Sequence, residues 1–167
     1  MRGSGAQGGL SSLLPQLSRW MYRGGRPNWL ARVMNRLGAI QYSAGLFTLG
    51  RGVTLEVRGR KSGKVVAFPL VLVDYEGGRY LVSMLGADVN WVHNVRAANG
   101  HAVLRQGTAG DVVLVEVDPA QRAPILRRYL ALAPGARPHI PVSRDAPLAE
   151  LEKIADHYPV FRVTQRE

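Results

Sequence analysis

A short cationic segment, Arg58 to Lys64, carries the clearest chemical signal in this sequence. It places four basic residues and Ser62 around two glycines, in the order Arg-Gly-Arg-Lys-Ser-Gly-Lys. Glycines let the backbone turn sharply and approach a ligand, and cations beside a hydroxyl give the charge-assisted hydrogen bonds that bind phosphate. We therefore expect an anion-binding turn. The alternative is a hairpin loop that is basic only because surface turns are often charged.

The residues on either side of this turn predict two antiparallel strands. Val53 to Val57 alternates apolar and polar residues, and Val65 to Val73 is almost continuously apolar. The turn is not a Walker loop, because only three residues separate its glycines and a strand follows it. The sequence also lacks a nucleophile elbow, a zinc-protease helix and a dinucleotide-binding fingerprint. An anion-binding turn without an evident nucleophile suggests a bound cofactor that brings its own chemistry.

The rest of the chain predicts an α+β fold with an antiparallel sheet. Five or six strands, mostly joined by short turns, favour a small barrel with helices outside it over a doubly wound parallel sheet. The expected elements after Val73 are a turn at Asp74–Gly78, a strand Arg79–Leu85, a helix Val89–Asn99 capped by Asp88, strands His101–Gln106 and Val112–Val117 joined by Gly107–Gly110, a helix from the Asp118 cap to Leu132, a loop over residues 133–146, a helix Pro147–His157 and a strand Tyr158–Thr164.

Composition narrows the class of protein. With 46% hydrophobic and 20% charged residues, the 167-residue chain has the make-up of an ordinary globular domain. The absence of cysteine excludes disulfides and thiolate sites, and the four histidines have no i,i+4 spacing, so no metal site is expected. We divide the chain into a flexible tail at 1–9, basic amphipathic helices over 10–49 and a cofactor-binding barrel over 50–167.

The net charge of +10 is concentrated near the N-terminus. Residues 1–55 contain seven arginines and no acid, which leaves 15 basic against 12 acidic residues in the remainder. Two stripes of apolar residues with helical spacing run through 10–49, with arginines on their other faces. One interpretation is that both helices cover the domain's own core. The other is that the first helix also lies on an anionic membrane surface.

Several motifs at matching intervals resemble those of one family. Gly59 to Gly63 at a hairpin, Pro69-Leu70 six residues on, Ser83 to Gly86 after a strand and Asn90 to Val95 at a helix start are similar to the deazaflavin (F420)-dependent nitroreductases of actinobacteria. This resemblance implies an antiparallel split β-barrel. It also implies an oxidoreductase that passes a hydride from reduced coenzyme F420 to a quinone, enone or nitroaromatic acceptor, in a cytoplasmic protein that is a monomer or homodimer.

The resemblance assigns the coenzyme to three segments but leaves the catalytic residue unknown. Arg60, Lys61 and Ser62 would hold the phosphate of the tail, and Val66 stands where the family commonly has an arginine, so Lys64 takes that contact. The complete cofactor set is Arg60, Lys61, Ser62, Gly63, Lys64, Val66, Phe68, Pro69, Leu70, Ser83, Met84, Leu85, Gly86, Asn90, Trp91, His93 and Asn94. By location alone, the substrate-pocket candidates are Trp20, Tyr129, His139 and Tyr158, with His157 beside them.

Alternatives remain open at this point. Trp91 is either a flat wall beside a ring system or simple core packing at a helix start. A split barrel of this kind is also consistent with an FMN enzyme, or with a non-catalytic carrier of a lipid or other anionic ligand at the membrane. The isoelectric point of about 10.8 raises the possibility of a nucleic-acid binder. We disfavour that class, because the excess cations lie on amphipathic helices.

We predict that the full chain sediments with vesicles of anionic lipid more strongly than a chain of residues 25–167, because the first basic helix is then missing. Co-sedimentation of both chains measures the difference, and vesicles of neutral lipid are the control. Equal partitioning of the two chains onto anionic vesicles would contradict the membrane hypothesis.

Overall fold

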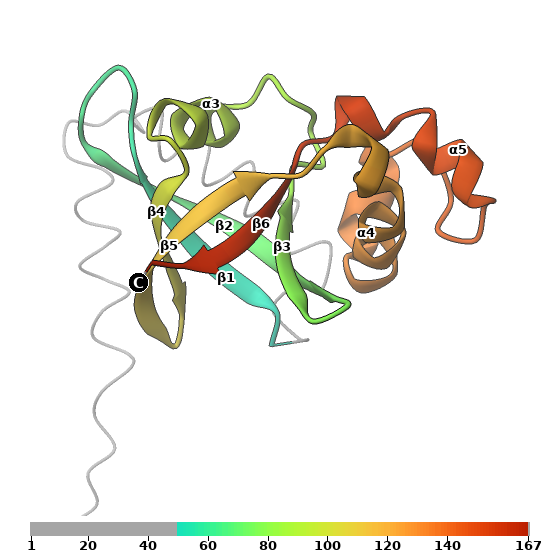
Figure 1. Ribbon diagram of the computed structural model, residues 1–167, viewed down its shortest axis with the longest axis horizontal. Helices are drawn as coiled ribbons and strands as arrows, with labels where there is room; N and C mark the ends of the chain where they lie inside the picture. The colour runs from blue at the N-terminus through green and yellow to red at the C-terminus, as the bar shows by residue number, and fades with distance from the viewer. Residues whose placement is uncertain (1–49, 167) are drawn as a thin grey trace, which may run out of the picture. The chain divides into compact units, whose positions relative to one another are not determined.

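The computed structural model describes residues 50–166, and these form a closed antiparallel barrel of six strands (Figure 1). The strand order is β1-β2-β3-β6-β5-β4, and β4 pairs with β1 to close the barrel. The predicted antiparallel split barrel is confirmed. The predictions for residues 1–49, including both amphipathic helices and Trp20, lie outside the described residues. The strands are β1 Gly52–Arg58, β2 Val65–Tyr75, β3 Gly78–Val82, β4 His101–Gln106, β5 Thr108–Glu116 and β6 Val160–Gln165.

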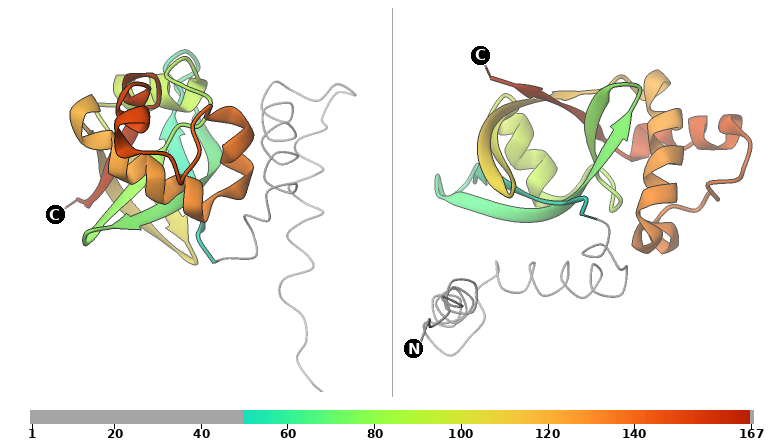
Figure 2. Two further views of the ribbon diagram at one scale, coloured as in Figure 1. Left: turned by 90° about the vertical axis from the view of Figure 1, so that its right-hand side faces the viewer. Right: turned by 90° about the horizontal axis from the view of Figure 1, so that it is seen from below.

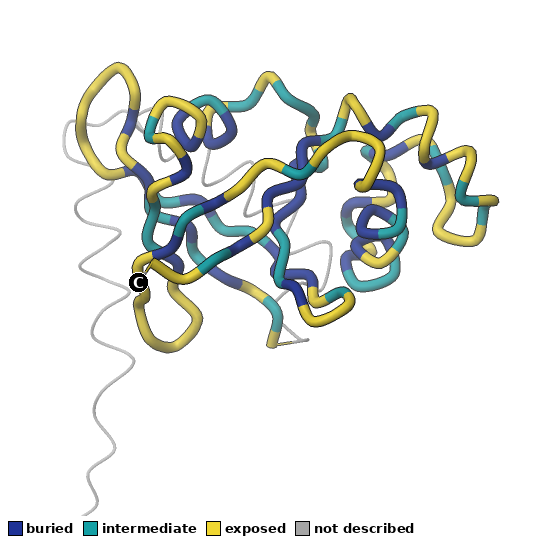
Figure 3. Tube along the Cα trace, viewed as in Figure 1, coloured by how far each residue is buried: buried dark blue, intermediate teal, exposed yellow. Residues whose placement is uncertain are grey.

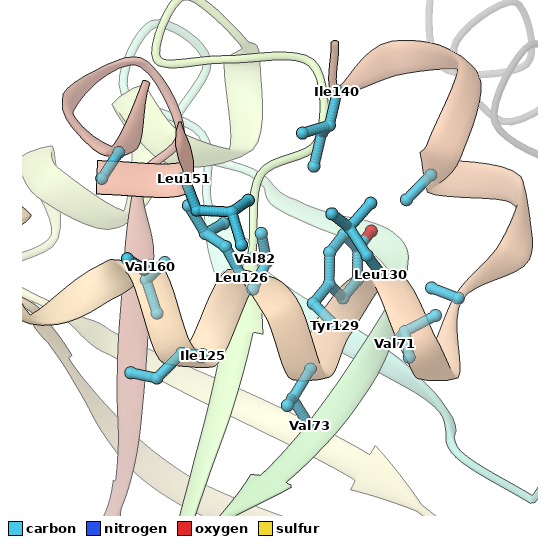
Figure 4. Close-up of a cluster of buried hydrophobic side chains, with 14 residues drawn as sticks. Val71, Val73, Val82, Ile125, Leu126, Tyr129, Leu130, Ile140, Leu151 and Val160 are labelled. Carbon is cyan, nitrogen blue, oxygen red and sulfur yellow. The ribbon is translucent and has the colours of Figure 1, made fainter. Parts of the chain in front are cut away.

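Strand β2 is almost continuously apolar because both of its faces are covered. Val66 and Phe68 are buried on the face toward the barrel interior, and Val71 and Val73 belong to a second core outside it. This outer core lies between β2, β3 and the helix α4, Pro119–Leu132 (Figure 4). Its largest members besides the two valines are Val82, Ile125, Leu126, Tyr129, Leu130, Ile140, Leu151 and Val160.

The helix α3, Asn90–Ala97, covers one end of the barrel (Figure 2). Its side chains Trp91, Val92 and Val95 are buried, and Trp91 packs against Phe161 of β6 with ring centroids 5.4 Å apart. The predicted cap at Asp88 is wrong. The capping position falls on Val89, whose backbone is extended, and the Asp88 carboxylate lies 2.7 Å from Nε2 of His93 instead.

Several strand boundaries differ from the prediction because turns form earlier or later than expected. Strand β3 ends at Val82 rather than Leu85, since the Ser83 hydroxyl donates to the Gly86 carbonyl oxygen at 2.6 Å and folds the chain back. Strand β2 continues through Asp74 and Tyr75, so the turn before β3 is shorter than Asp74–Gly78. Strand β5 begins at Thr108 rather than Val112, with Gly107 alone between the paired residues Gln106 and Thr108.

The α4 helix begins as predicted, with the Asp118 side chain accepting a hydrogen bond from the Ala120 backbone N–H at 2.9 Å. The loop predicted after α4 contains a 3-10 helix, and the last helix predicted for the chain is interrupted. Residues Pro134–His139 form a 3-10 helix, η2, inside the predicted 133–146 loop. The predicted helix Pro147–His157 consists of a short α5, Leu148–Glu152, and a separate 3-10 helix η3, Ala155–His157.

The buried side chain of Arg122 explains this interruption. Its Nη1 donates to the carbonyl oxygens of Ala155, Asp156 and Tyr158 at 3.2, 3.4 and 3.5 Å, so these oxygens are turned toward α4. Strand β6 accordingly begins at Val160 rather than Tyr158. Arg122 therefore fixes the segment before β6 to the first turns of α4.

A single carboxylate balances this buried guanidinium. Nη2 of Arg122 donates to Glu116 at 3.2 Å, and the more exposed Arg96 donates to the same carboxylate at 2.7 Å. Hydrogen bonding to Arg96, together with both positive charges, holds the pKa of Glu116 below its ordinary value. Burial lowers the pKa of Arg122. The guanidinium is nevertheless the charged donor of the network, since arginine remains protonated in proteins.

Gly100 is a position where a side chain does not fit. It has a φ of +80°, it links the end of α3 to β5 through a hydrogen bond from Leu114, and a Cβ there would collide with the Leu114 carbonyl oxygen. We predict that Gly100→Ala lowers the free energy of unfolding by about 3 to 4 kcal/mol, as strain plus overpacking. Gly107→Ala is the matched control, because its φ is +77° but nothing lies within 4 Å. Gly107→Ala should lower the free energy of unfolding by only about 1 to 2 kcal/mol. Equal losses in urea unfolding would contradict the steric explanation.

Replacing Arg122 should be far more damaging than replacing Arg96, although both bind Glu116. We predict that Arg122→Met lowers the free energy of unfolding by about 3 kcal/mol, because the carbonyl oxygens that it binds lose a charged donor. Arg96→Gln, the control, should cost less than about 1 kcal/mol, since its ion pair is exposed. Chemical denaturation measures both values. Similar losses for the two variants would show that the buried network does not stabilise this region.

Candidate functional site

The predicted anion-binding turn is a closed loop between β1 and β2. The Gly59 N–H donates to the Lys64 carbonyl oxygen and the Gly63 N–H donates to the Gly59 carbonyl oxygen, both at 2.8 Å. Gly63 has a φ of +67°, which glycine adopts without strain. An ideal Cβ at Gly59 would lie 2.8 Å from the Ser62 Oγ, so the loop closes tightly at that point. Lys61, Ser62 and Lys64 are exposed. In Figure 3 the loop between β1 and β2 is coloured as exposed over most of its length.

Arg60 is fastened to α3. Its backbone N–H and its Nη1 both donate to Oδ1 of the buried Asn94, at 3.2 and 3.0 Å, and Nη1 also reaches Oδ1 of Asn90 at 3.4 Å. Guanidinium carries five N–H donors, so these contacts leave others for a ligand. The structure thus brings together Arg60, Asn90 and Asn94, three of the predicted cofactor residues. In this structure the two asparagines orient the arginine.

The segment Ser83 to Gly86 borders an open pocket of about 600 Å³. Ser83 itself is buried, its N–H donates to the Pro159 carbonyl oxygen, and its hydroxyl closes the turn at Gly86. The pocket brings this predicted ring-binding segment together with two predicted substrate residues, His139 and Tyr158. The lining residues are Met84, Leu85, Gly86, Ala87, Asp88, His139, Asp156, His157 and Tyr158.

Polar contacts fix the walls of this pocket. Nδ1 of His157 lies 2.8 Å from the Asp156 carboxylate, and the Tyr158 hydroxyl donates to the His139 carbonyl oxygen at 3.0 Å. Tyr158 therefore joins η2 to the segment before β6. Arg122 binds that same segment through the Asp156 and Tyr158 carbonyl oxygens. Asp88 also lines the pocket, and its carboxylate lies 2.7 Å from Nε2 of His93.

Other predicted residues lie elsewhere. Tyr129 is in the outer core, only 4% exposed, and burial raises the pKa of its phenol, so it is a neutral packing residue away from this pocket. Val66, Phe68 and Trp91 are buried in the barrel, and the contact of Trp91 with Phe161 matches the core-packing alternative. Pro69 and Leu70 are half-buried in the middle of β2.

Sequence reasoning overlooked three residues that shape the site. Asp88 has the appearance of a helix cap in the sequence, and Asp156 that of an ordinary helix position. Arg122 gives no local signal, because the carbonyl oxygens that its Nη1 binds lie 33 to 36 residues further along the chain. No pattern in a single sequence indicates such a long-range contact.

The remaining site classes receive no support from the described part of the chain. Within residues 50–166, no group of three or more His, Asp or Glu side chains is arranged to hold a metal ion. None of the helices there has the length and apolar character that crossing a membrane requires. A second pocket of about 500 Å³ is lined by Arg137 and residues 140–145, none of which is a predicted site residue.

Comparison with known proteins places this fold and these segments in a family. A family model described as F420H(2)-dependent quinone reductase matches residues 33–149, which include the cationic turn, α3 and most of the pocket. No curated protein matches the chain. The family match gives no support for the FMN alternative.

Solved structures with similar folds include three of interest. An F420-H2 dependent reductase, FDR-A, is 25% identical with a TM-score of 0.46, covering 68% of this chain and 94% of that one. A chain described as a domain-swapped dimer is 20% identical with a TM-score of 0.50, covering 79% and 96%. A conserved hypothetical protein of Mycobacterium tuberculosis is 14% identical with a TM-score of 0.48, covering 75% and 79%.

The expected resemblance to F420-dependent reductases is confirmed, because the family model spans well over half of the sequence. The chain belongs to the F420H2-dependent quinone reductase family and, as a member of it, is an F420H2-dependent reductase.

Proposed function

We propose that the protein passes a hydride from reduced F420 to a small organic acceptor, first of all a quinone. Enones and nitroaromatics are further candidate acceptors. One observation carries the proposal: the cationic turn and the open pocket border the same helix. Asn90 and Asn94 of α3 hold Arg60 of the turn, while Gly86 to Asp88, which lead into α3, line the pocket. The turn, α3 and the segment before it lie along one edge of the barrel (Figure 1).

The donor set of the turn fits the anionic tail of F420. Arg60, Lys61 and Lys64 are cationic and exposed, and Ser62 adds a hydroxyl. Charged donors of this kind bind phosphate with short, strong hydrogen bonds. Val66 is buried in the barrel, whereas Lys64 is exposed, so Lys64 is the residue we assign to the contact that the family commonly makes with an arginine.

The pocket fits the ring end of the coenzyme. Its volume of about 600 Å³ lies in the range of small-molecule sites, which is roughly 300 to 1,000 Å³. Gly86 has a φ of +87°, a backbone conformation that glycine adopts without strain. The turn that borders the pocket therefore favours glycine at this position. Met84 and Leu85 supply apolar surface for a planar ring.

The residues of this chain act by binding and orientation. Bound reduced F420 supplies the hydride, and that is the chemistry for which the protein needs it. The cationic turn would fix the tail, the Ser83–Gly86 backbone would fix the plane of the ring, and Met84 with Leu85 would exclude water from the reacting face. Binding and orientation by the protein, with the hydride supplied by the coenzyme, agree with a sequence in which no nucleophile motif is evident.

Other expectations remain proposals. A peripheral contact with anionic membrane depends on residues 10–49, which lie outside the described residues, and the oligomeric state is still either monomer or homodimer. A non-catalytic carrier would bind a lipid but would not oxidise reduced F420. A nucleic-acid binder would bind DNA or RNA with a steep salt dependence. A cytoplasmic location accompanies the main proposal.

We predict that Lys61→Ala weakens F420 binding by about 1.5 to 3 kcal/mol, which is roughly 10- to 150-fold, because one charged hydrogen bond to phosphate is lost. Arg60→Ala should weaken it at least as much, and it also removes the side-chain donor to the buried Asn94 while the backbone N–H donor remains. Titration of coenzyme fluorescence measures both affinities, and thermal unfolding checks that Arg60→Ala still folds. Arg128→Ala, an exposed arginine on α4, is the control and should bind F420 like the wild type.

Unchanged affinity in Lys61→Ala would contradict the assignment of the turn to the tail. A wild-type chain that binds no F420 would contradict the proposed function as a whole. Binding of FMN in place of F420 would favour the flavin alternative.

A further inference from the structure

Histidine is concentrated around the open pocket. The chain has four histidines, of which His139 and His157 line the pocket and His93 is bonded to Asp88, another lining residue. The fourth, His101, is exposed on β4. Imidazole is the side chain whose ordinary pKa lies nearest neutral pH, and within residues 50–166 no group of His, Asp and Glu is arranged for a metal ion. Proton transfer is the function that such a group can serve.

We propose that His157 is the general acid that protonates the acceptor, an inference that rests on the proposed function. Its Nδ1 lies 2.8 Å from the Asp156 carboxylate, an arrangement in which Nδ1–H donates to Asp156 and Nε2 is the nitrogen left for a substrate. His157 and Gly86 line the same pocket, and the backbone carbonyl oxygen of His157 lies 3.4 Å from an ideal Cβ position on Gly86. The backbone of His157 is therefore next to the segment that we assign to the coenzyme ring.

His157 is favoured over the other imidazoles by two properties together. Among the described residues, the histidines paired with a carboxylate at this site are His93 and His157, and of these only His157 lines the pocket. His139 lines the pocket from η2, and its backbone carbonyl oxygen accepts a hydrogen bond from the Tyr158 hydroxyl. The other titratable side chains that line this pocket are Asp88, His139, Asp156 and Tyr158, and Asp88 is bonded to His93.

The proton and electron balance is simple. A quinone that receives one hydride from bound reduced F420 would gain two electrons and become the hydroquinone monoanion. The coenzyme would lose that hydride and release one proton from its ring nitrogen to solvent. The N–H bond at Nε2 of protonated His157 then breaks, and its proton forms the O–H bond of the neutral hydroquinone. The side chain of His157 is 74% exposed, so the neutral imidazole regains a proton from solvent.

The test compares His157→Gln with the wild type in the oxidation of reduced F420 by 2-methyl-1,4-naphthoquinone between pH 5 and 9. The wild-type kcat should fall as the pH rises over this interval, because a general acid loses its proton. His157→Gln should lower kcat roughly 100-fold and lose this pH dependence, while its affinity for F420 is unchanged. Asp156→Asn should give an intermediate loss, and His101→Gln should leave the rate unaltered.

A second readout needs no turnover. In NMR spectra of the protein without coenzyme, the His157 ring resonance is identified by its loss in His157→Gln. Adding the naphthohydroquinone should shift this resonance and leave that of His101 in place.

An unaltered kcat and pH profile in His157→Gln would overturn the proposal, and so would a profile that disappears in His139→Gln instead. Absence of the NMR shift, in a protein that turns over normally, would also count against contact with the acceptor. Failure of the wild type to bind F420 is distinguishable from these results, because it removes the proposed function and this inference together.

Discussion

The double burial of β2 is the constraint on which the described structure depends. One face of this strand fills the barrel interior with Val66 and Phe68, and the other receives α4 through Val71 and Val73. Since α4 is fixed there, Arg122 on its first turns lies within reach of the chain that enters β6. The outer core also contacts the open pocket directly, because the lining residues Met84 and Tyr158 pack against it. A strand with one solvated face could not couple the barrel to the pocket in this way.

Local patterns in the sequence were enough to predict most of the elements. The alternation of apolar and polar residues predicted β1, and the continuous apolar run predicted β2. Asp118-Pro119 predicted the start of α4, where the Asp118 carboxylate does cap the helix. The errors arise where distant contacts decide. Ser83 ends β3 by bonding to Gly86, and Arg122 breaks the last helix by binding its carbonyl oxygens. Such contacts join residues that no helical or strand period relates.

In the candidate site, too, local sequence patterns indicated some residues, while distant contacts decided the position of others. The sequence indicated the cationic turn and the Ser83–Gly86 segment because glycines, cations and a hydroxyl are conspicuous there. It placed His139 and Tyr158 in a substrate pocket only by position, and the structure brings both to the Ser83–Gly86 segment. It also proposed Tyr129, which α4 turns into the outer core. Whether a residue on an amphipathic helix lies in the core or at a surface site depends on which face of the helix packs against the sheet. The sequence did not determine that face for α4.

The bonds between Arg60 and α3 have a consequence for affinity. A free arginine side chain loses about 1.5 to 2 kcal/mol of rotamer entropy when a ligand immobilises it. Here the Asn94 and Asn90 oxygens already restrict the guanidinium in the unliganded protein. Much of that entropic cost is therefore met during folding, and an anion that binds at the turn meets a preorganised donor. The two asparagines thereby contribute to the affinity for an anion by holding Arg60 in place before the anion binds.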